Sequence, residues 1–418
     1  MPYADYLKKK GPRIGMSIDL LILFLISVHM FYLKPFAPLF GGEGTFTYFL
    51  LMLAYLYIRY LGFSVRFGIA KKMIPLLWIT IGIVLSFVPA YVFYGQHIYY
   101  SFIAYRHFLC LLALPILFSI RPSRTEIKRA LYAFSVIFLF LTVYVTFVMP
   151  SWVEVLDGHL FIDEGELVHV LPGPHFVMLA FIFALEDFRR KMDVNYFLRA
   201  AFFFLILILV QNRTLLICSM AVIVLAALFN KSAKTRIAAE VLLLMVGIAL
   251  VVLGNRYFLA LWNETVYQLN NPDYNRVRAF MYFTSVKNGP LSFFLGNGFI
   301  SGRVNPIMQN LMKEGIYNSD LGLIGMWHQF GLIPVITILV IEIRGLSRKH
   351  SFLVRACSLF MLLCSMTIAY FVDSEFIIWL CLHLYLYGSD VAFDEAVLMQ
   401  KKKIERRILR RYRSISSS

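Results

Sequence analysis

Apolar residues run along the chain in long segments of close to 20 residues, separated by shorter polar stretches rich in lysine and arginine. A helix needs about 20 apolar residues to cross roughly 30 Å of hydrocarbon. Inside lipid every backbone amide must be bonded internally, so such segments form helices or closed barrels. Barrel strands alternate apolar and polar side chains, and these segments do not. The pattern therefore predicts an all-α, polytopic membrane protein.

The pattern divides into twelve predicted membrane spans. They cover residues 16–33, 45–62, 73–94, 101–120, 127–149, 170–187, 197–211, 214–230, 237–254, 321–342, 352–372 and 375–389. Only Gln211-Asn212-Arg213 separates the seventh span from the eighth, and we divide them because one membrane helix seldom needs that length. The whole chain, 1–418, is expected to form one membrane domain, with a polar insertion at 255–320 and a basic tail at 390–418.

Composition narrows the class further. Of the 418 residues, 60% are hydrophobic and 15% are charged, and the net charge is +16. On a soluble protein that charge would suggest nucleic acid, but here the basic residues follow the membrane topology. The five cysteines lie inside apolar segments without zinc-ligand or disulfide-framework spacing. We therefore expect buried cysteines, a lipid bilayer as partner, no nucleic acid, and neither metal nor cofactor.

Most of the 40 lysines and arginines fall on one side of the twelve spans, together with both termini. Cytoplasmic loops carry such an excess, so this side is predicted to be cytoplasmic. The exceptions are Lys34, Arg106, Arg213, Arg256, Arg276, Arg278, Lys287, Arg303 and Lys313. Basic residues on the outward side oppose the topological bias, and a functional role is one explanation.

The outward insertion contains the stretch NPDYNRVRAFMYFTSVKNGPLSFFLGNGF, residues 271–299. It predicts a helix over 275–288, and a second short helix is expected over 305–313. Gly296 and Gly298 can adopt positive φ in a turn that exposes amide hydrogens to an anion. The other outward segment, 150–169, is acidic, and we expect a solvated loop there.

Arginine is suited to phosphate because its planar guanidinium forms bidentate bonds and stays charged. Arg276 and Arg278 are two residues apart, so they do not share a helix face; they predict a diphosphate site or, alternatively, a basic surface helix. Arg213 and Arg106 lie near the outward ends of the eighth and fourth spans. A charge at membrane depth costs at least ~2–3 kcal/mol, so it usually faces a cavity or a partner, although Arg106 could instead snorkel to the interface.

Four stretches resemble the O-antigen polymerase and O-antigen ligase superfamily, membrane glycosyltransferases that assemble bacterial surface polysaccharides. In chain order they are PGPHFVMLAFIFAL (172–185), QNRTLLICSMAV (211–222), NRVRAFMYFTSVKNGPLSFFLGNGF (275–299) and YNSDLGLIGMWHQFGLIPV (317–335). Ligases of this family carry a histidine where this chain has Tyr317. That departure favours a polymerase over a ligase.

The resemblance implies an enzyme of the bacterial inner membrane that joins oligosaccharide repeat units carried on polyprenyl diphosphate. It implies catalytic roles for Arg213, Arg278 and Asp320, with Asp320 as the proton acceptor. The implied substrate-binding residues are Arg106, His175, Arg276, Arg303, Tyr317 and His328. A chain-length regulator and a flippase are the implied protein partners.

Several alternatives stay open at this point. Asp320 could instead cap a helix, since Asn318-Ser319-Asp320 is typical of a helix start, and His328 could be a satisfied core histidine. At the level of function, the alternatives are a ligase, a flippase for lipid-linked oligosaccharides, and a non-catalytic assembly partner. A transporter is expected to show repeated halves and polar residues near the membrane midplane, and no repeat is visible in the chain.

Overall fold

A computed structural model gives the arrangement of most of the chain. The residues that it describes are 13–33, 35–36, 43–61, 73–147, 160–163, 166–169, 171–210, 212–228, 266, 271, 274–285, 289–300, 305–368 and 374–390. The predicted span 237–254, the basic tail beyond residue 390 and Arg303 lie outside these ranges.

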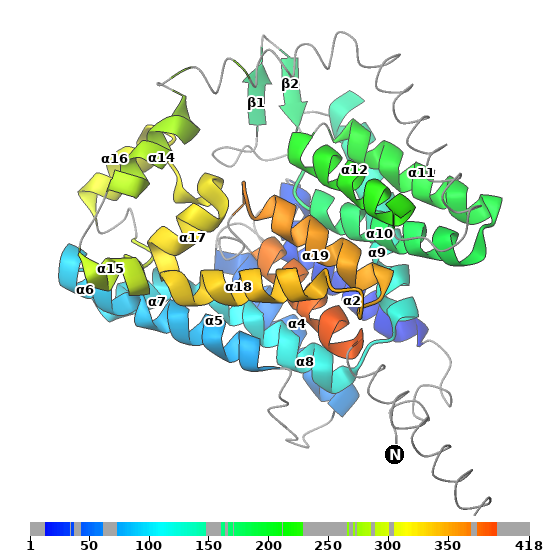
Figure 1. The fold of residues 1–418 in the computed structure, drawn as a ribbon, viewed down its shortest axis with the longest axis horizontal. Helices are drawn as coiled ribbons and strands as arrows, with labels where there is room; N and C mark the ends of the chain where they lie inside the picture. Colours follow the sequence, from blue (N-terminus) through cyan, green and yellow to red (C-terminus); the bar gives the residue numbers. More distant parts are fainter. Residues whose placement is uncertain are drawn as a thin grey trace, which may run out of the picture.

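The described chain is helical apart from one short hairpin (Figure 1). The amino-terminal half contains α2 (Ile14–Ser27), η1 (His29–Tyr32), α4 (Glu43–Leu61), α5 (Ile74–Leu85), α6 (Phe87–Tyr94), α7 (Ile98–Ala104), η3 (Arg106–Leu112), α8 (Ala113–Ile120), α9 (Arg124–Phe147), α10 (Pro174–Lys191), α11 (Val194–Leu209) and α12 (Arg213–Leu228). The carboxyl-terminal half contains α14 (Asn275–Ser285), α15 (Pro290–Leu295), α16 (Pro306–Lys313), η5 (Asn318–Leu321), α17 (Gly322–Phe330), α18 (Leu332–Gly345), α19 (Phe352–Cys364) and helix 374–390.

The predicted spans and the observed helices agree in position. A helix lies over each of the predicted spans that fall on described residues, and α14 and α16 occupy the two short helices predicted in the insertion. Within the described part of the chain, Ile74–Tyr94 and Arg124–Val145 are long and apolar enough to cross a membrane. The helices Ile98–Ala104 and Arg106–Ile120 are together long and apolar enough to form a third span, which would be bent by 62°.

Four predicted helices differ from the observed ones. The span predicted over 352–372 is too long, because α19 ends at Cys364 and residues 365–367 form a turn. Span 321–342 is divided into α17 and α18 at Gly331, whose φ of +74° does not continue a helix. Span 101–120 bends between α7 and η3. The first span is shorter than 16–33, because α2 ends at Ser27 and is followed by positive φ angles at Met30 and Phe31. The apolar pattern along the sequence cannot predict these breaks, because they depend on packing of the backbone against other segments of the chain.

The predicted solvated loop at 150–169 was wrong in part. Residues Leu160–Asp163 (β1) and Glu166–His169 (β2) pair as an antiparallel hairpin, with Leu160 opposite His169 and Asp163 opposite Glu166. The hairpin lies at the same end of the molecule as α14 and α16 (Figure 1), which we call the α14 end of the bundle.

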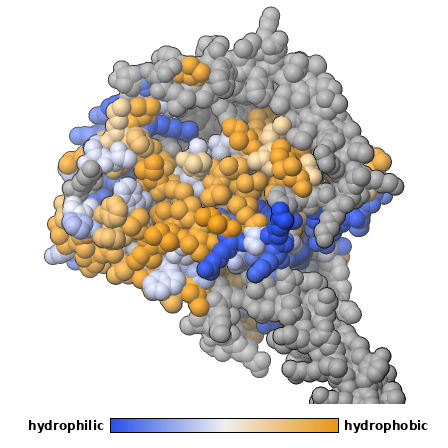
Figure 2. All heavy atoms as spheres, viewed as in Figure 1, coloured by the Kyte–Doolittle hydropathy of each residue, from blue (hydrophilic) through white to orange (hydrophobic). Residues whose placement is uncertain are grey.

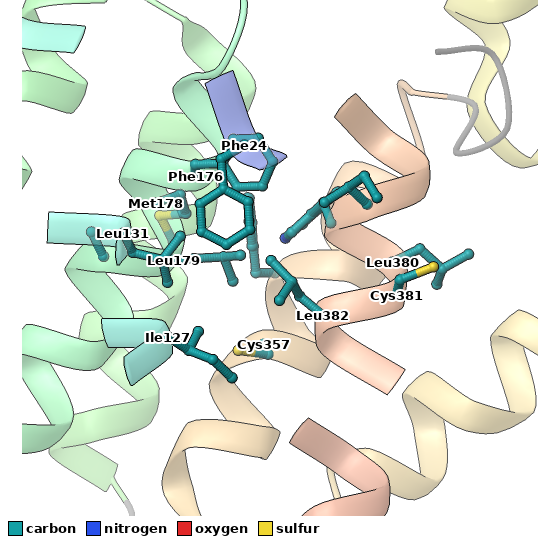
Figure 3. Close-up of a cluster of buried hydrophobic side chains, with 14 of the residues drawn as sticks. Phe24, Ile127, Leu131, Phe176, Met178, Leu179, Cys357, Leu380, Cys381 and Leu382 are labelled. Carbon is teal, nitrogen blue, oxygen red and sulfur yellow. The ribbon is translucent and has the colours of Figure 1, made fainter. Parts of the chain in front are cut away.

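The core is formed where α2, α9, α10, α19 and helix 374–390 meet. Figure 3 shows this cluster, which includes Phe24, Ile127, Leu131, Phe176, Met178, Leu179, Cys357, Leu380, Cys381 and Leu382. The rings of Phe24 and Phe176 stack at 4.8 Å between centroids. All five cysteines are free and buried, as the sequence predicts. The core thus fixes the starts of α10 and helix 374–390 relative to each other.

An apolar face covers α5, α15 and α18, with hydrophilic residues gathered along its edges (Figure 2). On α18 the side chains of Ile336, Val340 and Ile343 form one exposed stripe, with exposed fractions of 51%, 39% and 60%. Leu77 and Trp78 of α5 are 53% and 49% exposed. Contiguous exposed apolar surface of this kind is rare on soluble monomers and marks a surface that contacts another apolar phase or partner.

Candidate functional site

Three helices and one short 3-10 turn meet at the α14 end of the bundle. The amide of Leu323 in α17 donates to the carbonyl of Ser365 at 2.7 Å, which joins the start of α17 to the last turn of α19. The hydroxyls of Thr214 and Thr367 are 3.4 Å apart and join the start of α12 to the same turn. Gly322 makes this approach possible, because a Cβ there would lie 2.1 Å from the Ser365 oxygen.

Two further helices begin beside this junction. His175 is the second residue of α10, and its ring lies 6.4 Å from Phe360, about two turns before Thr367 on α19. Glu375, at the start of helix 374–390, bonds to His175. We call the first residues of α10, α12, α17 and helix 374–390, together with residues 364–367 at the end of α19, the helix-end cluster.

The helix-end cluster contains both signs of charge, because helix N-termini are positive whereas the carboxyl end of α19 and the carboxylate of Glu375 are negative. Each helix carries roughly half a positive charge at its N-terminus, where backbone amides lack internal partners. In α12 the side chain of Asn212 accepts the Leu215 amide at 3.1 Å and so fixes the start of that helix. Arg213 is the first residue of α12. Converging helix N-termini next to an arginine are an arrangement that suits a phosphate group.

The two arginines of α14 point to different surroundings, as their spacing predicts. Arg278 forms an ion pair with Glu314, which follows α16, and the two side chains are 38% and 51% exposed. Arg276 is exposed. α14 packs against η5 and α17, with Ala279 and Phe283 buried in that contact. The opening stretch of the insertion is therefore held next to η5, the segment that contains Asp320.

The glycine-rich turn after α15 does not present free amides, so the predicted anion-binding turn was wrong. Gly296 and Gly298 have the expected positive φ angles of +78° and +77°. However, the Asn297 amide donates to the His328 carbonyl at 2.7 Å, and the Gly298 amide donates to the Gln329 carbonyl at 2.8 Å. These amides are used to dock the turn on the end of α17 rather than to bind a ligand.

His328 lies in a packed junction between α17, α14 and η5. Its ring meets Phe283 edge-on at 4.8 Å, and its Nδ1 lies 3.4 Å from the Asn318 side-chain nitrogen. The side chain is 7% exposed. His328 is therefore part of the packed core, but its Nε2 has no hydrogen-bond partner among the described residues, and its predicted role in substrate binding stays a prediction. Tyr317, by contrast, is 38% exposed at the entry to η5.

Arg106 lies at the bend between α7 and η3, where one of its guanidinium nitrogens donates to the Ile103 carbonyl at 3.1 Å. Its neighbour Tyr105 is buried against Phe330, with ring centroids 4.6 Å apart. Phe330 is the last residue of α17, whereas the helix-end cluster contains the first residue of α17, eight residues earlier. Arg106 thus belongs to a second junction, formed by two broken helices.

Asp320 belongs to η5, two residues before the start of α17 at the helix-end cluster. The side chains of Asp320 and Arg213 lie outside the described part of the structure.

Among the described residues, no three histidine, cysteine, aspartate or glutamate side chains form a group that could hold a metal.

Glu375 is a residue of the site that the sequence did not predict. Its carboxylate lies 2.8 Å from Nδ1 of His175 and accepts the Gly173 amide at 3.0 Å. Both side chains are 5% exposed. One signal was present in the sequence, because Glu375 is a carboxylate at the start of an otherwise apolar span, two residues after Asp373, and charged residues inside a span usually have a partner.

Comparison of the chain with protein-family models and with curated proteins gives no match.

Proposed function

We propose that this protein is a membrane glycosyltransferase that polymerises oligosaccharide repeat units carried on polyprenyl diphosphate into a surface polysaccharide. In this proposal the chain crosses the bacterial inner membrane twelve times, both termini are cytoplasmic, and the α14 end faces outward. A chain-length regulator and a flippase act beside it. The apolar face over α5, α15 and α18 supports a lipid environment, since it would otherwise be exposed to water.

The observation that carries the proposal is the meeting of distant segments at the helix-end cluster. The four stretches that resemble the polymerase and ligase superfamily lie between residues 172 and 335, and 131 residues (186–316) separate the first stretch from the last. Three of them supply the starts of α10, α12 and α17, and the fourth supplies α14, which packs on η5. Alternation of the spans already places these starts at one end of the bundle, and the contacts of Leu323 with Ser365 and of Thr214 with Thr367 bring the starts of α17 and α12 together on the last turn of α19.

The chemistry follows from the charges at this end. When a sugar hydroxyl attacks the anomeric carbon of the donor, the bond to the diphosphate breaks and the leaving group takes the electron pair. Preorganised positive groups stabilise the charge that develops on the phosphate oxygens. Arg213 and the helix N-termini supply such groups. Arg276, Arg278 and Arg303 lie on the insertion and are proposed to hold the diphosphate or the glycan.

A flippase for lipid-linked oligosaccharides is the second candidate. The observation that favours it is the junction of two broken helices, α7 with η3 and α17 with α18, because discontinuous helices form the binding sites of many transporters. A ligase uses the same donor and remains the third candidate.

A deletion strain distinguishes the three functions by what it accumulates. Loss of the polymerase leaves single repeat units on the surface acceptor and removes the long ladder on a polysaccharide gel. Loss of a ligase leaves long polymer on the lipid carrier, and loss of a flippase leaves single lipid-linked units on the cytoplasmic face. The proposal predicts the first result, restored by the wild-type gene, and either of the others would overturn it.

The ion pair of Arg278 with Glu314 yields a separate prediction. If Arg278 binds the substrate, Arg278→Ala shortens the polymer and Glu314→Gln does not, because the latter leaves the guanidinium free. An exposed pair contributes only about 0.2–1 kcal/mol to stability, so neither change is expected to lower protein abundance. The measurement is ladder length on a gel, with abundance followed by immunoblot.

The charge-exchanged variant, Arg278→Glu with Glu314→Arg, provides the control. It rebuilds the contact between α14 and the turn after α16 but removes the positive charge from position 278. We expect it to behave like Arg278→Ala. Recovery of long polymer in the exchanged variant would assign Arg278 to packing of the insertion instead.

A further inference from the structure

Helix 374–390 takes part in two buried pairs of histidine and glutamate. Near its start, Glu375 lies 2.8 Å from Nδ1 of His175. Further along, His383 lies 3.0 Å from a carboxylate oxygen of Glu342 in α18, with side chains only 0% and 1% exposed. The two pairs have the same chemistry and share a helix, but they are separated by eight residues, or about 12 Å along the helix axis. Only the pair of His175 and Glu375 belongs to the helix-end cluster.

The carboxylate of Glu375 is held at both of its oxygens. One accepts the backbone amide of Gly173, and the other contacts Nδ1 of His175. A carboxylate at Nδ1 fixes the tautomer that carries its proton on that nitrogen. Since both partners are on the first residues of their helices, the position of the imidazole is set by the packing of α10 against helix 374–390.

Within the described part of the chain the other ring nitrogen, Nε2 of His175, is buried and has no hydrogen-bond partner; Nδ1 of His383 in the second pair is buried and unpartnered in the same way. A buried polar atom that is left unpaired destabilises the folded state. Three aromatic side chains surround the ring, with centroids at 4.7 Å for Phe376, 5.3 Å for Trp379 and 6.4 Å for Phe360. In the tautomer that Glu375 favours, Nε2 carries a lone pair in surroundings that exclude water.

We propose that His175 is the proton acceptor of the glycosyl transfer and that Glu375 is its positioning residue. This assignment rests on the proposed function and replaces Asp320 in that role. The hydroxyl oxygen of the acceptor sugar forms a bond to the anomeric carbon of the donor, and the bond from that carbon to the diphosphate oxygen breaks. The hydroxyl proton passes to Nε2 of His175, and the diphosphate leaves with the bonding electron pair.

The local charges explain why the pair needs a carboxylate. The N-termini of α10 and helix 374–390 carry partial positive charge, which would oppose formation of an imidazolium. Glu375 supplies the compensating negative charge directly at Nδ1, as the carboxylate of a catalytic triad does. The aromatic wall around Nε2 must open when the acceptor binds, so the site admits substrate but little water.

The test uses purified full-length protein in lipid nanodiscs and the lipid-linked oligosaccharide extracted from the deletion strain. We expect His175→Gln and Glu375→Gln each to lower kcat by about 100-fold or more, the typical range for loss of a general base, with little change in KM. Added imidazole is expected to restore polymer formation to His175→Gly. The matched controls are His383→Gln and Glu342→Gln, which alter the equivalent buried pair and are expected to keep a kcat close to that of the wild type.

Each outcome decides between specific alternatives. Near-normal kcat in folded His175→Gln, or equal losses in the His383 and Glu342 controls, would make the pair structural and overturn the assignment. If the imidazole fails to rescue His175→Gly while Asp320→Asn loses all activity, Asp320 is the base instead. If the wild-type protein forms no polymer from the extract, the proposed function itself falls, and this assignment falls with it.

Discussion

Replacing Arg213 by alanine is expected to remove the long polysaccharide ladder while leaving the protein in the membrane at normal abundance. Arg213 is the first residue of α12, whose neighbour Thr214 touches the last turn of α19 at the helix-end cluster. Loss of one preorganised donor to a developing anion commonly lowers kcat by about 100- to 1,000-fold. An effect of this size converts a long ladder into single repeat units.

The lysine variant sharpens this prediction. Arg213→Lys keeps the charge but loses the planar, bidentate geometry, so we expect it to be nearly as inactive as Arg213→Ala. Arg199→Ala provides the control, because Arg199 is exposed on α11, the helix that precedes α12. The readout is ladder length together with abundance by immunoblot. Full ladders in both Arg213 variants would exclude Arg213 from the catalytic site and favour the transporter.

Replacing Gly331 by alanine is expected to have the largest effect on folding. Gly331 separates α17 from α18 with φ of +74° and ψ of −169°, a region that is essentially restricted to glycine. A Cβ at this position would lie 2.1 Å from the carbonyl oxygen of Phe294. The variant must therefore displace the last turn of α15 from the end of α17, in addition to straining its own backbone.

Gly289 offers a closely matched control. It precedes α15 with nearly the same backbone angles, φ of +84° and ψ of −171°, but an added Cβ meets no atom within 4 Å. Gly289→Ala should thus cost only the backbone strain, about 1–3 kcal/mol. We expect a modest fall in Tm for Gly289→Ala and a large loss of monodisperse protein on size-exclusion chromatography for Gly331→Ala. Equal behaviour of the two variants would contradict the close docking at Gly331.

Much of the fold could be predicted because apolar length and charge are local properties. The runs of apolar residues located the helices, and Asn288-Gly289-Pro290 marked the end of the α14 region before α15 begins. The breaks at Gly331 and between α7 and η3 could not be predicted in the same way. Each depends on a segment distant in sequence, Phe294 for Gly331 and Phe330 for Tyr105, that packs against the break.

The candidate site was predictable only in part. Misplaced positive charge indicated Arg213, Arg276 and Arg278, because charge on the outward side opposes a strong topological bias. The local sequence does not distinguish Arg278 from Arg276. Arg278 has a carboxylate partner, but that partner is 36 residues away in the sequence. The amides of the turn at Gly296 to Gly298 were expected to be free, but the end of α17 uses them.

The sequence by itself determined the helical class, the positions of the helices and the residue types available for phosphate chemistry, since these follow from hydropathy and charge along a single segment. Only the tertiary structure decided which of those residues meet. His175 and Glu375 are 200 residues apart, and neither position identifies the other as its partner. They form a pair because the core packs α10 against helix 374–390, and a contact between helices is a property of their packing rather than of either sequence.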